Sequence, residues 1–193
     1  MGISLSKGQK IDLSKSSTVS LQHVFMGLGW DPVKPSGFFA RLFSSEDIDL
    51  DASCLMFDQK KELVEMVYYG RLRSIDGAII HTGDNLTGEG DGDDEVIKVD
   101  LTTLPAKIQY LAFTINSFRG QTFDQVENAF CRLVNDSNNQ EICRYTLNEK
   151  GGHTGVVMAV VQRNSSGWTM QAIGEAGRGK TAKDMVPSII KHL

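Results

Sequence analysis

Apolar and polar residues alternate along two stretches of the chain, a pattern typical of strands that bury one face. The clearer stretch runs from Asp47 to Met56, and its polar face carries the carboxylates of Asp47, Asp49 and Asp51. The second runs from Glu95 to Leu101. Both stretches predict strands. The side chains predicted to point into the core of the first are Ile48, Leu50, Ala52, Cys54 and Met56.

Further strands are indicated by runs of β-branched and aromatic residues bounded by turn residues. The segment from Val24 to Phe43 contains several Gly and Pro residues and is expected to form a long loop. The additional strands are expected at Ile108–Ser117, Ala129–Val134, Glu141–Leu147, Gly155–Gln162 and Gly167–Ile173, the last four as two strand pairs.

Helical signals are few. Apolar residues at 123, 126 and 130 indicate one short helix. A second helix is expected over Thr181–Leu193, where Thr181 and Asp184 resemble a capping box and Pro187 falls in the first turns. Many short strands with few helices predict a mainly β protein, a β-sandwich of two antiparallel sheets with a few short peripheral helices. No linker or repeat is evident, so a single domain over 1–193 is expected.

Composition narrows the class of protein. The 193 residues include 40% hydrophobic side chains and a net charge of −4, which exclude intrinsic disorder and disfavour a nucleic-acid-binding protein. No apolar run is long enough to span a bilayer, and no secretory signal is evident. The three cysteines are too few and too widely spaced for a disulfide framework or a zinc site. They are expected to be reduced core residues of a cytoplasmic protein.

The negative charge is concentrated in one acidic segment, residues 84–95, which reads DNLTGEGDGDDE. It holds six carboxylates and no basic residue, while 20 basic and 18 acidic residues lie elsewhere, a balance of +2. Crowded carboxylates repel one another unless a cation neutralises them. Carboxylate, amide and carbonyl oxygens are the ligands that Ca²⁺ prefers, and glycines let such a loop fold tightly. We therefore expect a Ca²⁺ site, with Asp49 and Asp51 as additional ligands.

Other interpretations of the acidic segment remain open. Asp84 and Glu95 occupy positions 1 and 12 of an EF-hand loop, but Glu89 stands where that loop requires Gly, so the segment is not an EF-hand. Zinc is disfavoured because the segment has no His or Cys, and His81 stands alone beside it. A solvated acidic loop is one alternative to metal binding. Another is direct contact with a basic partner, which would weaken with salt.

One sequence motif suggests a different function, nucleotide binding. Gly174–Thr181 reads GEAGRGKT and satisfies the phosphate-binding pattern G-x-x-x-x-G-K-[ST], which would place Lys180 on a phosphate. The strands around it indicate antiparallel hairpins rather than the parallel units of nucleotide-binding folds, so a Gly-rich strand-to-helix turn is favoured. Nucleotide binding is kept as the alternative function. The four histidines form no recognisable catalytic arrangement, and we expect no enzyme activity.

The chain resembles the TerD family of bacterial tellurium-resistance and stress proteins, most closely its TerZ-like branch. The resemblance covers nearly the whole length and rests on SLSKGQKIDLSK, GLGWDP, IDLDASC, HTGDNLTGEGDGDDE, FTINSFRGQTFDQVENAFCRLVND and GWTMQAIG. It implies a β-sandwich that binds two Ca²⁺ ions between acidic loops. The ligand set that it implies, together with Asn85 where many members have Asp, is Asp49, Asp51, Asp84, Asn85, Asp91, Asp93, Asp94 and Glu95.

The resemblance also implies a role. It indicates a cytoplasmic, non-enzymatic Ca²⁺ sensor, scaffold or partner-binding module encoded in a stress-response operon for tellurite resistance, phage inhibition and colicin tolerance. The expected partners are other proteins of that operon, through which the chain can join a membrane-associated complex, and not nucleic acid. Asn116 and Ser117 are weaker candidate ligands near the end of a predicted strand.

Overall fold

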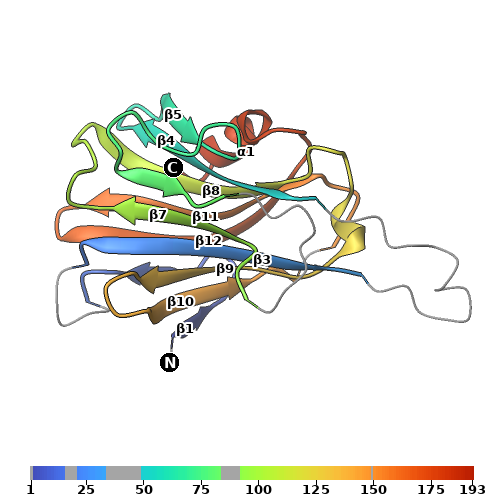
Figure 1. The fold of residues 1–193 in the computed structure, drawn as a ribbon, viewed down its shortest axis with the longest axis horizontal. Helices are drawn as coiled ribbons and strands as arrows, with labels where there is room; N and C mark the ends of the chain where they lie inside the picture. The colour runs from blue at the N-terminus through green and yellow to red at the C-terminus, as the bar shows by residue number, and fades with distance from the viewer. Residues whose placement is uncertain (1, 16–20, 34–48, 84–91, 149) are drawn as a thin grey trace, which may run out of the picture.

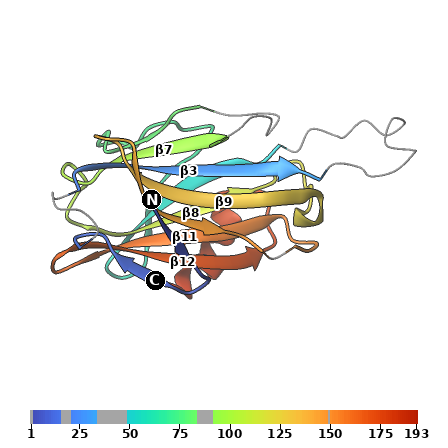
Figure 2. The same ribbon diagram turned by 90° about the horizontal axis from the view of Figure 1, so that it is seen from below.

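A computed structural model of the chain describes residues 2–15, 21–33, 49–83, 92–148 and 150–193. In these residues the chain forms two six-stranded sheets that pack face to face, which Figure 2 shows as two layers. The prediction of a mainly β sandwich with few short helices is confirmed.

The first sheet, sheet A, contains the two strands between which the acidic segment runs. Its strand order is β1-β10-β9-β3-β7-β6. Neighbouring strands are antiparallel except β1 and β10, which pair in parallel at one edge of the sheet. Its strands are β1 (Ile3–Leu5), β3 (His23–Pro32), β6 (Ile79–His81), β7 (Glu95–Asp100), β9 (Val126–Asn135) and β10 (Gln140–Thr146).

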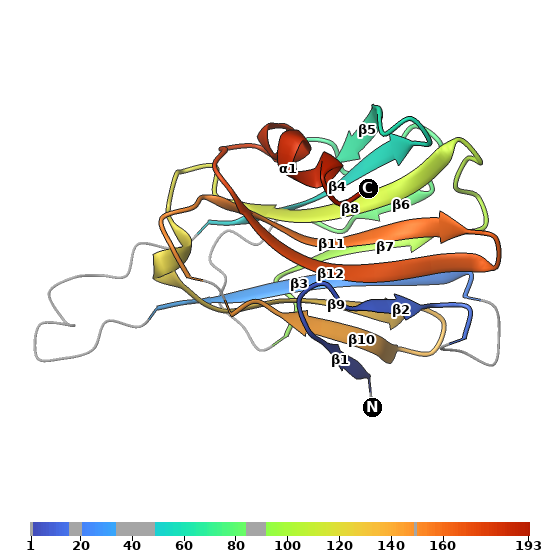
Figure 3. The ribbon, with the colours of Figure 1, turned by 180° about the vertical axis from the view of Figure 1, so that it is seen from behind.

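The second sheet, sheet B, lies behind sheet A in the orientation of Figure 1 and in front of it in Figure 3. Its strand order is β2-β12-β11-β8-β4-β5, with antiparallel neighbours throughout. The two predicted strand pairs, β9 with β10 and β11 with β12, are confirmed. The strands of sheet B are β2 (Lys10–Asp12), β4 (Asp51–Asp58), β5 (Leu63–Val67), β8 (Ile108–Asn116), β11 (Gly155–Asn164) and β12 (Gly167–Gly177).

The main core lies between the sheets and follows the predicted alternation. Ala52, Cys54 and Met56 of β4 are fully buried in it. The prediction of a half-buried strand is wrong, however, because the other face of β4 is buried as well. Asp49 and Asp51 are each only 8% exposed rather than lying on a solvated face.

A second apolar cluster explains the burial of Leu55 and Phe57 on the other face of β4. It lies on the outer face of sheet B beneath the C-terminal segment, which Figure 3 shows crossing in front of that sheet. The predicted C-terminal helix is only partly correct, because the segment folds as a 3₁₀ turn, η2 (Ala182–Met185), and one short helix, α1 (Val186–Ile190). Pro187 lies in the first turn of α1 as expected. The buried members of this outer cluster are Leu55, Phe57, Ala112, Val157, Val160, Ile173, Ala182, Met185 and Ile189.

The predicted loop at 24–43 is wrong over its described part, because residues 23–32 form β3 between β7 and β9. Val24, Met26 and Leu28 point into the core. Two glycines alternate with them, and a Cβ at Gly27 would stand 2.2 Å from the Asp93 carboxylate. Glycine here makes room for a neighbour and does not mark a turn. Residues 34–43 lie outside the described residues.

The predicted helix at 123–130 is also wrong. Only Phe123–Gln125 forms a single 3₁₀ turn, η1, and Val126 already begins β9. Phe123 is buried and stacks on the ring of His153, with 4.8 Å between ring centroids. The apolar residues at 126 and 130 therefore belong to a strand and not to a helical stripe.

Candidate functional site

The acidic segment connects β6 to β7, and its last residues meet the start of β4 from the opposite sheet. The backbone N–H of Ala52 donates to Oε2 of Glu95 over 2.7 Å, which joins the two layers. The Glu95 side chain is fully buried between the sheets. The chain neighbour of Ala52 is Asp51, so carboxylates from both sheets gather at one end of the sandwich, here called the acidic end.

His81 holds Glu95 from the other side. Its Nε2 lies 3.1 Å from Oε2 of Glu95, and both side chains are fully buried. The backbone N–H of Gly83 donates to Nδ1 of His81 over 3.2 Å, so Nδ1 acts as an acceptor and the proton lies on Nε2. The imidazole therefore donates to Glu95. The sequence offered no signal for this contact beyond the position of His81 beside the acidic segment.

Asp94 is held by the backbone of β3. Its Oδ2 accepts a hydrogen bond of 2.7 Å from the Trp30 N–H, and its own N–H donates to the Leu28 carbonyl over 2.8 Å. These two bonds fix the point where the acidic segment enters the sheet. The bond from Trp30 to the carboxylate is charge-assisted and therefore stronger than a neutral one.

Asp93 is paired with an arginine that sequence reasoning missed. The Arg132 guanidinium donates from Nε and Nη2 to the two Asp93 oxygens, over 2.7 and 2.8 Å. These hydrogen bonds raise the pKa of Arg132 above its ordinary value. The pair spans 39 residues of sequence and requires Gly27 beneath it, so the glycine pattern in β3 was the only sequence signal for it.

The arginine pairing continues along the outer face of sheet A. Arg132 and Arg144 both contact Glu141, at 3.5 and 3.0 Å. Partial burial acts to raise the pKa of Glu141, but its hydrogen bonds and charge interactions with the two guanidinium groups hold that pKa below its ordinary value. The Arg144 guanidinium also lies 4.3 Å from the centroid of the Phe130 ring.

Asp49 and Asp51 lie where β4 begins. Oδ2 of Asp49 forms an ion pair with Nε of Arg119, at 2.9 Å. Asp51 stands opposite Asn116 in the register of β4 and β8. The candidate Asn116 is buried, and Ser117 bonds through Oγ to the side chain of Gln121 over 2.9 Å.

The described residues therefore bring five of the eight predicted ligands to one end of the molecule: Asp49, Asp51, Asp93, Asp94 and Glu95. Asp84, Asn85 and Asp91 lie outside the described residues. Within the part of the chain that the structure describes, no three His, Cys, Asp or Glu side chains converge as a complete metal site. The five carboxylates face two guanidinium groups, Arg119 and Arg132, and the neutral His81, an excess of three negative charges.

The phosphate-binding interpretation of Gly174–Thr181 is not supported. Its first four residues continue strand β12, so they form no loop. Asp184 then occupies the place of an anion, because its Oδ2 accepts from the backbone N–H groups of Lys180 and Thr181, over 3.1 and 3.0 Å. Those hydrogen bonds hold the pKa of Asp184 below its ordinary value. The donors that would cradle a phosphate are taken by the protein's own carboxylate.

The cysteines are core residues, as predicted. All three are free and buried, and burial raises the pKa of the Cys143 thiol to about 12. A thiol that stays protonated is a poor nucleophile and a poor metal ligand. Among the described residues, no helix has the length and apolar character needed to cross a membrane.

Known proteins resemble this chain over nearly its whole length. A family model described as the TerD domain matches residues 1–186. The chain is 51% identical to the tellurium resistance protein TerZ of Serratia marcescens over 189 residues, or 97% of each protein. It is 41% identical to the stress response protein SCP2 of Bacillus subtilis (strain 168), over 96% of this chain and 98% of that protein.

The fold is shared with a solved structure as well. The crystal structure of a homologue of the telluride resistance protein TerD from Streptomyces coelicolor A3(2) superposes with a TM-score of 0.69. The match covers 86% of this chain and 96% of that one, at 22% identity, and so shows the likeness of fold. With the match to the family model and the two relatives, it leads to one conclusion: the chain belongs to the TerD family of tellurium-resistance and stress-response proteins.

Proposed function

We propose that this protein is a non-enzymatic, Ca²⁺-binding member of the stress response, which binds the ion at the acidic end. The observation that carries the proposal is that five carboxylates gather there against two guanidinium groups, with Asp49, Asp51 and Glu95 buried and the other two partly buried. Buried carboxylates are costly without compensating positive charge. The sequence of the acidic segment adds Asp84, Glu89 and Asp91, which enlarge the excess of negative charge.

The donor set fits a hard cation. Its members are carboxylates and one amide, Asn85, and within the described part of the chain His81 contacts Glu95 by donating a hydrogen bond to it. Oxygen donors in this number suit Ca²⁺, which takes six to eight of them, better than Zn²⁺. Two ions, as the resemblance implies, would more than offset the described excess. The bound ion would supply charge neutralisation and order to the acidic segment.

The described carboxylates play unequal parts in this proposal. Asp93 is bound at both oxygens by Arg132, so we assign it the role of anchoring the acidic segment on sheet A. Glu95 joins the sheets through Ala52 and is fixed by His81. Asp51 comes from the opposite sheet and is the described residue that we expect to contribute most directly to the ion.

We propose no catalytic step for this protein. Its three thiols are buried, and the phosphate-loop-like segment is filled by Asp184. We propose that Ca²⁺ sets the shape and charge of the acidic end, which partner proteins of the stress response then recognise in the cytoplasm. In this proposal the ion converts a strongly negative surface into a nearly neutral one, so it decides which partners can approach.

Calorimetric titration of the chelator-treated protein with Ca²⁺ and with Mg²⁺ tests the proposal. We expect saturable binding of up to two Ca²⁺ ions and weaker binding of Mg²⁺. The melting temperature should rise with Ca²⁺, because an ion that binds only the folded form stabilises it by about 2.7 kcal/mol at a hundredfold excess over Kd. Absence of both heat and melting shift at millimolar Ca²⁺ would refute it.

Two variants separate ligands from general charge effects. Asp51→Asn should remove more than half of the Ca²⁺-dependent melting shift. Asp124→Asn removes the same charge from the exposed first turn of η1 and should leave that shift unchanged. Equal effects of the two substitutions would mean that the shift reflects overall charge screening and not a site. Direct recognition of a basic partner would instead give binding that needs no Ca²⁺ and weakens with salt.

A further inference from the structure

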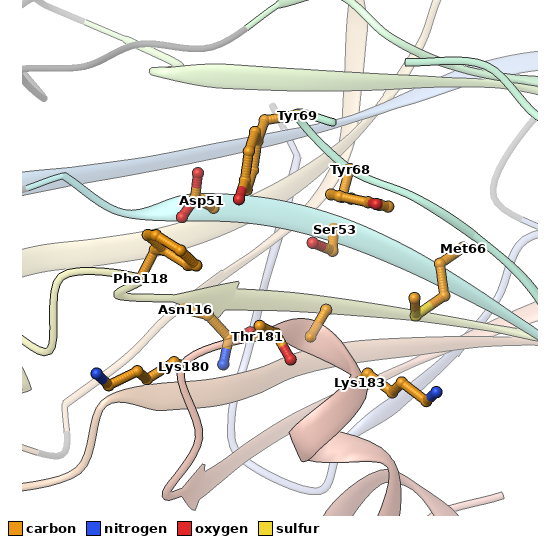
Figure 4. Close-up of a pocket in the computed structure, with 11 residues that line it drawn as sticks. Asp51, Ser53, Met66, Tyr68, Tyr69, Asn116, Phe118, Lys180, Thr181 and Lys183 are labelled. Atoms are coloured by element: carbon orange, nitrogen blue, oxygen red, sulfur yellow. The ribbon is translucent and has the colours of Figure 1, made fainter. Parts of the chain in front are cut away.

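A pocket of about 280 Å³ opens on the outer face of sheet B, beside the acidic end. Figure 4 shows the ends of β4 and β8 forming its floor, with the segment after β5 on one side and the start of η2 on the other. Asp51, Ser53 and Asn116 come from the two strands, and Lys180 and Lys183 come from the C-terminal segment. A volume near 300 Å³ is at the lower end for small-molecule sites.

One side of the pocket is aromatic. The rings of Tyr69 and Phe118 meet edge to face, with 6.3 Å between centroids, and Tyr68 meets Tyr69 in the same way at 5.4 Å. Tyr69 is 41% exposed and Phe118 is 51% exposed, so apolar ring surface faces solvent at the mouth. Met66 and Ala182 extend this apolar lining. Such a wall suits a planar ring, which aromatic side chains bind by stacked or edge contacts.

The floor carries an unsatisfied amide. Asn116 is 1% exposed, and neither its Oδ1 nor its Nδ2 has a hydrogen-bond partner among the described residues. In Figure 4 this amide points from β8 toward Lys180 and Thr181. Buried polar groups are nearly always hydrogen-bonded, and one left unsatisfied needs an explanation. A ligand group that both donates and accepts would provide it.

The charge around the pocket defines the ligand further. Lys180 and Lys183 border the pocket with their side-chain stems, and Figure 4 shows their ammonium ends on opposite sides of it. Together with the Asp51 carboxylate these residues carry a balance of +1, which matches a monoanion. A phosphate is disfavoured because the backbone N–H groups of Lys180 and Thr181, and the Thr181 hydroxyl, already donate to Asp184. Lysine side chains without a backbone cradle suit a carboxylate.

We propose that this pocket binds a small aromatic carboxylate. The ring lies against Tyr69 and Phe118, the exposed Lys180 and Lys183 side chains turn toward the carboxylate, and a hydroxyl or amide substituent bonds to Asn116. The site is separate from the Ca²⁺ proposal in its chemistry, although Asp51 borders both. The proposal is therefore tested on the full chain in two buffers, one with a chelator and one with Ca²⁺.

The probe is 4-hydroxybenzoate, titrated into ¹⁵N-labelled protein while amide shifts are recorded. We expect saturable shifts at the backbone amides of 116–118 and 180–183 in at least one of the two buffers. The neutral 4-hydroxybenzyl alcohol should bind about tenfold more weakly, because it lacks the charge that the lysines bind. Phenyl phosphate should bind no more tightly than 4-hydroxybenzoate. Absence of shifts in both buffers at 10 mM of the probe, or tighter binding of phenyl phosphate, overturns the proposal.

Variants locate the site. Lys180 and Lys183 are exposed, so the double substitution to Met leaves the fold intact and should raise Kd for the probe about tenfold or more. Lys107→Met removes an exposed lysine away from the pocket and should leave Kd unchanged. We expect 4-hydroxybenzoate to bind more tightly than benzoate, because its hydroxyl bonds to Asn116. Asn116→Leu keeps the side-chain size and should remove that preference. If the lysine double variant and Lys107→Met bind equally, the pocket is not the site.

Discussion

The outer faces of the two sheets are stabilised by different physical means. On sheet A, the outer face is polar and ionic, with Asp93 held by Arg132 and Glu141 held by Arg132 and Arg144. On sheet B, the outer face is apolar, and Phe57 of β4 and Ile189 of α1 are fully buried there. The same strand alternation therefore produces one face that depends on charge pairing and another that depends on exclusion of water.

The difference bears on function. A face held by ion pairs responds to pH, salt and added cations, because each of these changes the strength of charge interactions. A face held by apolar packing is nearly indifferent to them. Asp93, which anchors the acidic segment, belongs to the first kind, whereas the pocket beside Asn116 adjoins the second. We therefore expect Ca²⁺ to act mainly through sheet A and the acidic end, over an apolar base that does not change.

The prediction with the largest expected effect concerns the apolar outer face of sheet B. Ile189→Ala leaves a cavity under α1 and should lower the free energy of unfolding by about 3 kcal/mol. Since the lost interaction is apolar, the loss should be the same at low and high salt. Ile190→Ala is the matched control, because Ile190 is its neighbour on the same helix but is 39% exposed. Urea unfolding at two salt concentrations measures both, and equal losses would mean that α1 is not docked as described.

A second prediction concerns the packing of Asp93 over Gly27. Gly27→Ala places a methyl group 2.2 Å from the carboxylate and should cost about 2 kcal/mol, because the anchored pair must move. In an Asp93→Ala background the same substitution should cost much less, since the obstructing group is gone. Gly152→Ala, at a glycine with open space around it, should be neutral. Additive effects in the double variant would show that the carboxylate does not lie over β3.

The inner faces of the strands could be predicted because alternation records burial directly. Ala52, Cys54 and Met56, and likewise Ile97 and Val99, lie in the core as the pattern indicates. The strand β3 could not be predicted, because two of its outward positions, Gly27 and Gly29, are glycines that make room for Asp93 and Phe130. Local sequence shows that a residue is small but not which distant group needs the space.

The candidate site, too, could be predicted from local sequence only in part. Local charge density marked the acidic segment, and the chain order placed Asp93, Asp94 and Glu95 at the start of β7. Their partners come from elsewhere in the fold, Arg132 from β9 and Trp30 from β3, and depend on strand register. The phosphate-loop pattern failed because a match of eight letters does not show that Asp184 fills the anion position.

The prediction with the smallest expected effect concerns the ionic outer face of sheet A. The folded-state pKa of Glu141 lies below its ordinary value of 4.5, so its ionised form stabilises the folded protein at pH above that value. That stabilisation should be lost as the pH falls below about 4.5 and through the folded-state pKa. Glu141→Gln should therefore reduce stability by about 1 kcal/mol or less at pH 7, because Glu141 is 24% exposed, and the difference should shrink only as the pH falls below about 4.5.

The control for this prediction is a surface pair. Glu127 and Lys150 are about half exposed, so Glu127→Gln should change stability little at any pH. Denaturant unfolding from pH 7 to pH 3.5 measures both variants against the unsubstituted chain. The Ile189→Ala difference, being apolar, should stay constant over the same range. If Glu141→Gln were equally constant, the guanidinium groups would not be stabilising its charge, and the outer face of sheet A would be held by packing, as sheet B is.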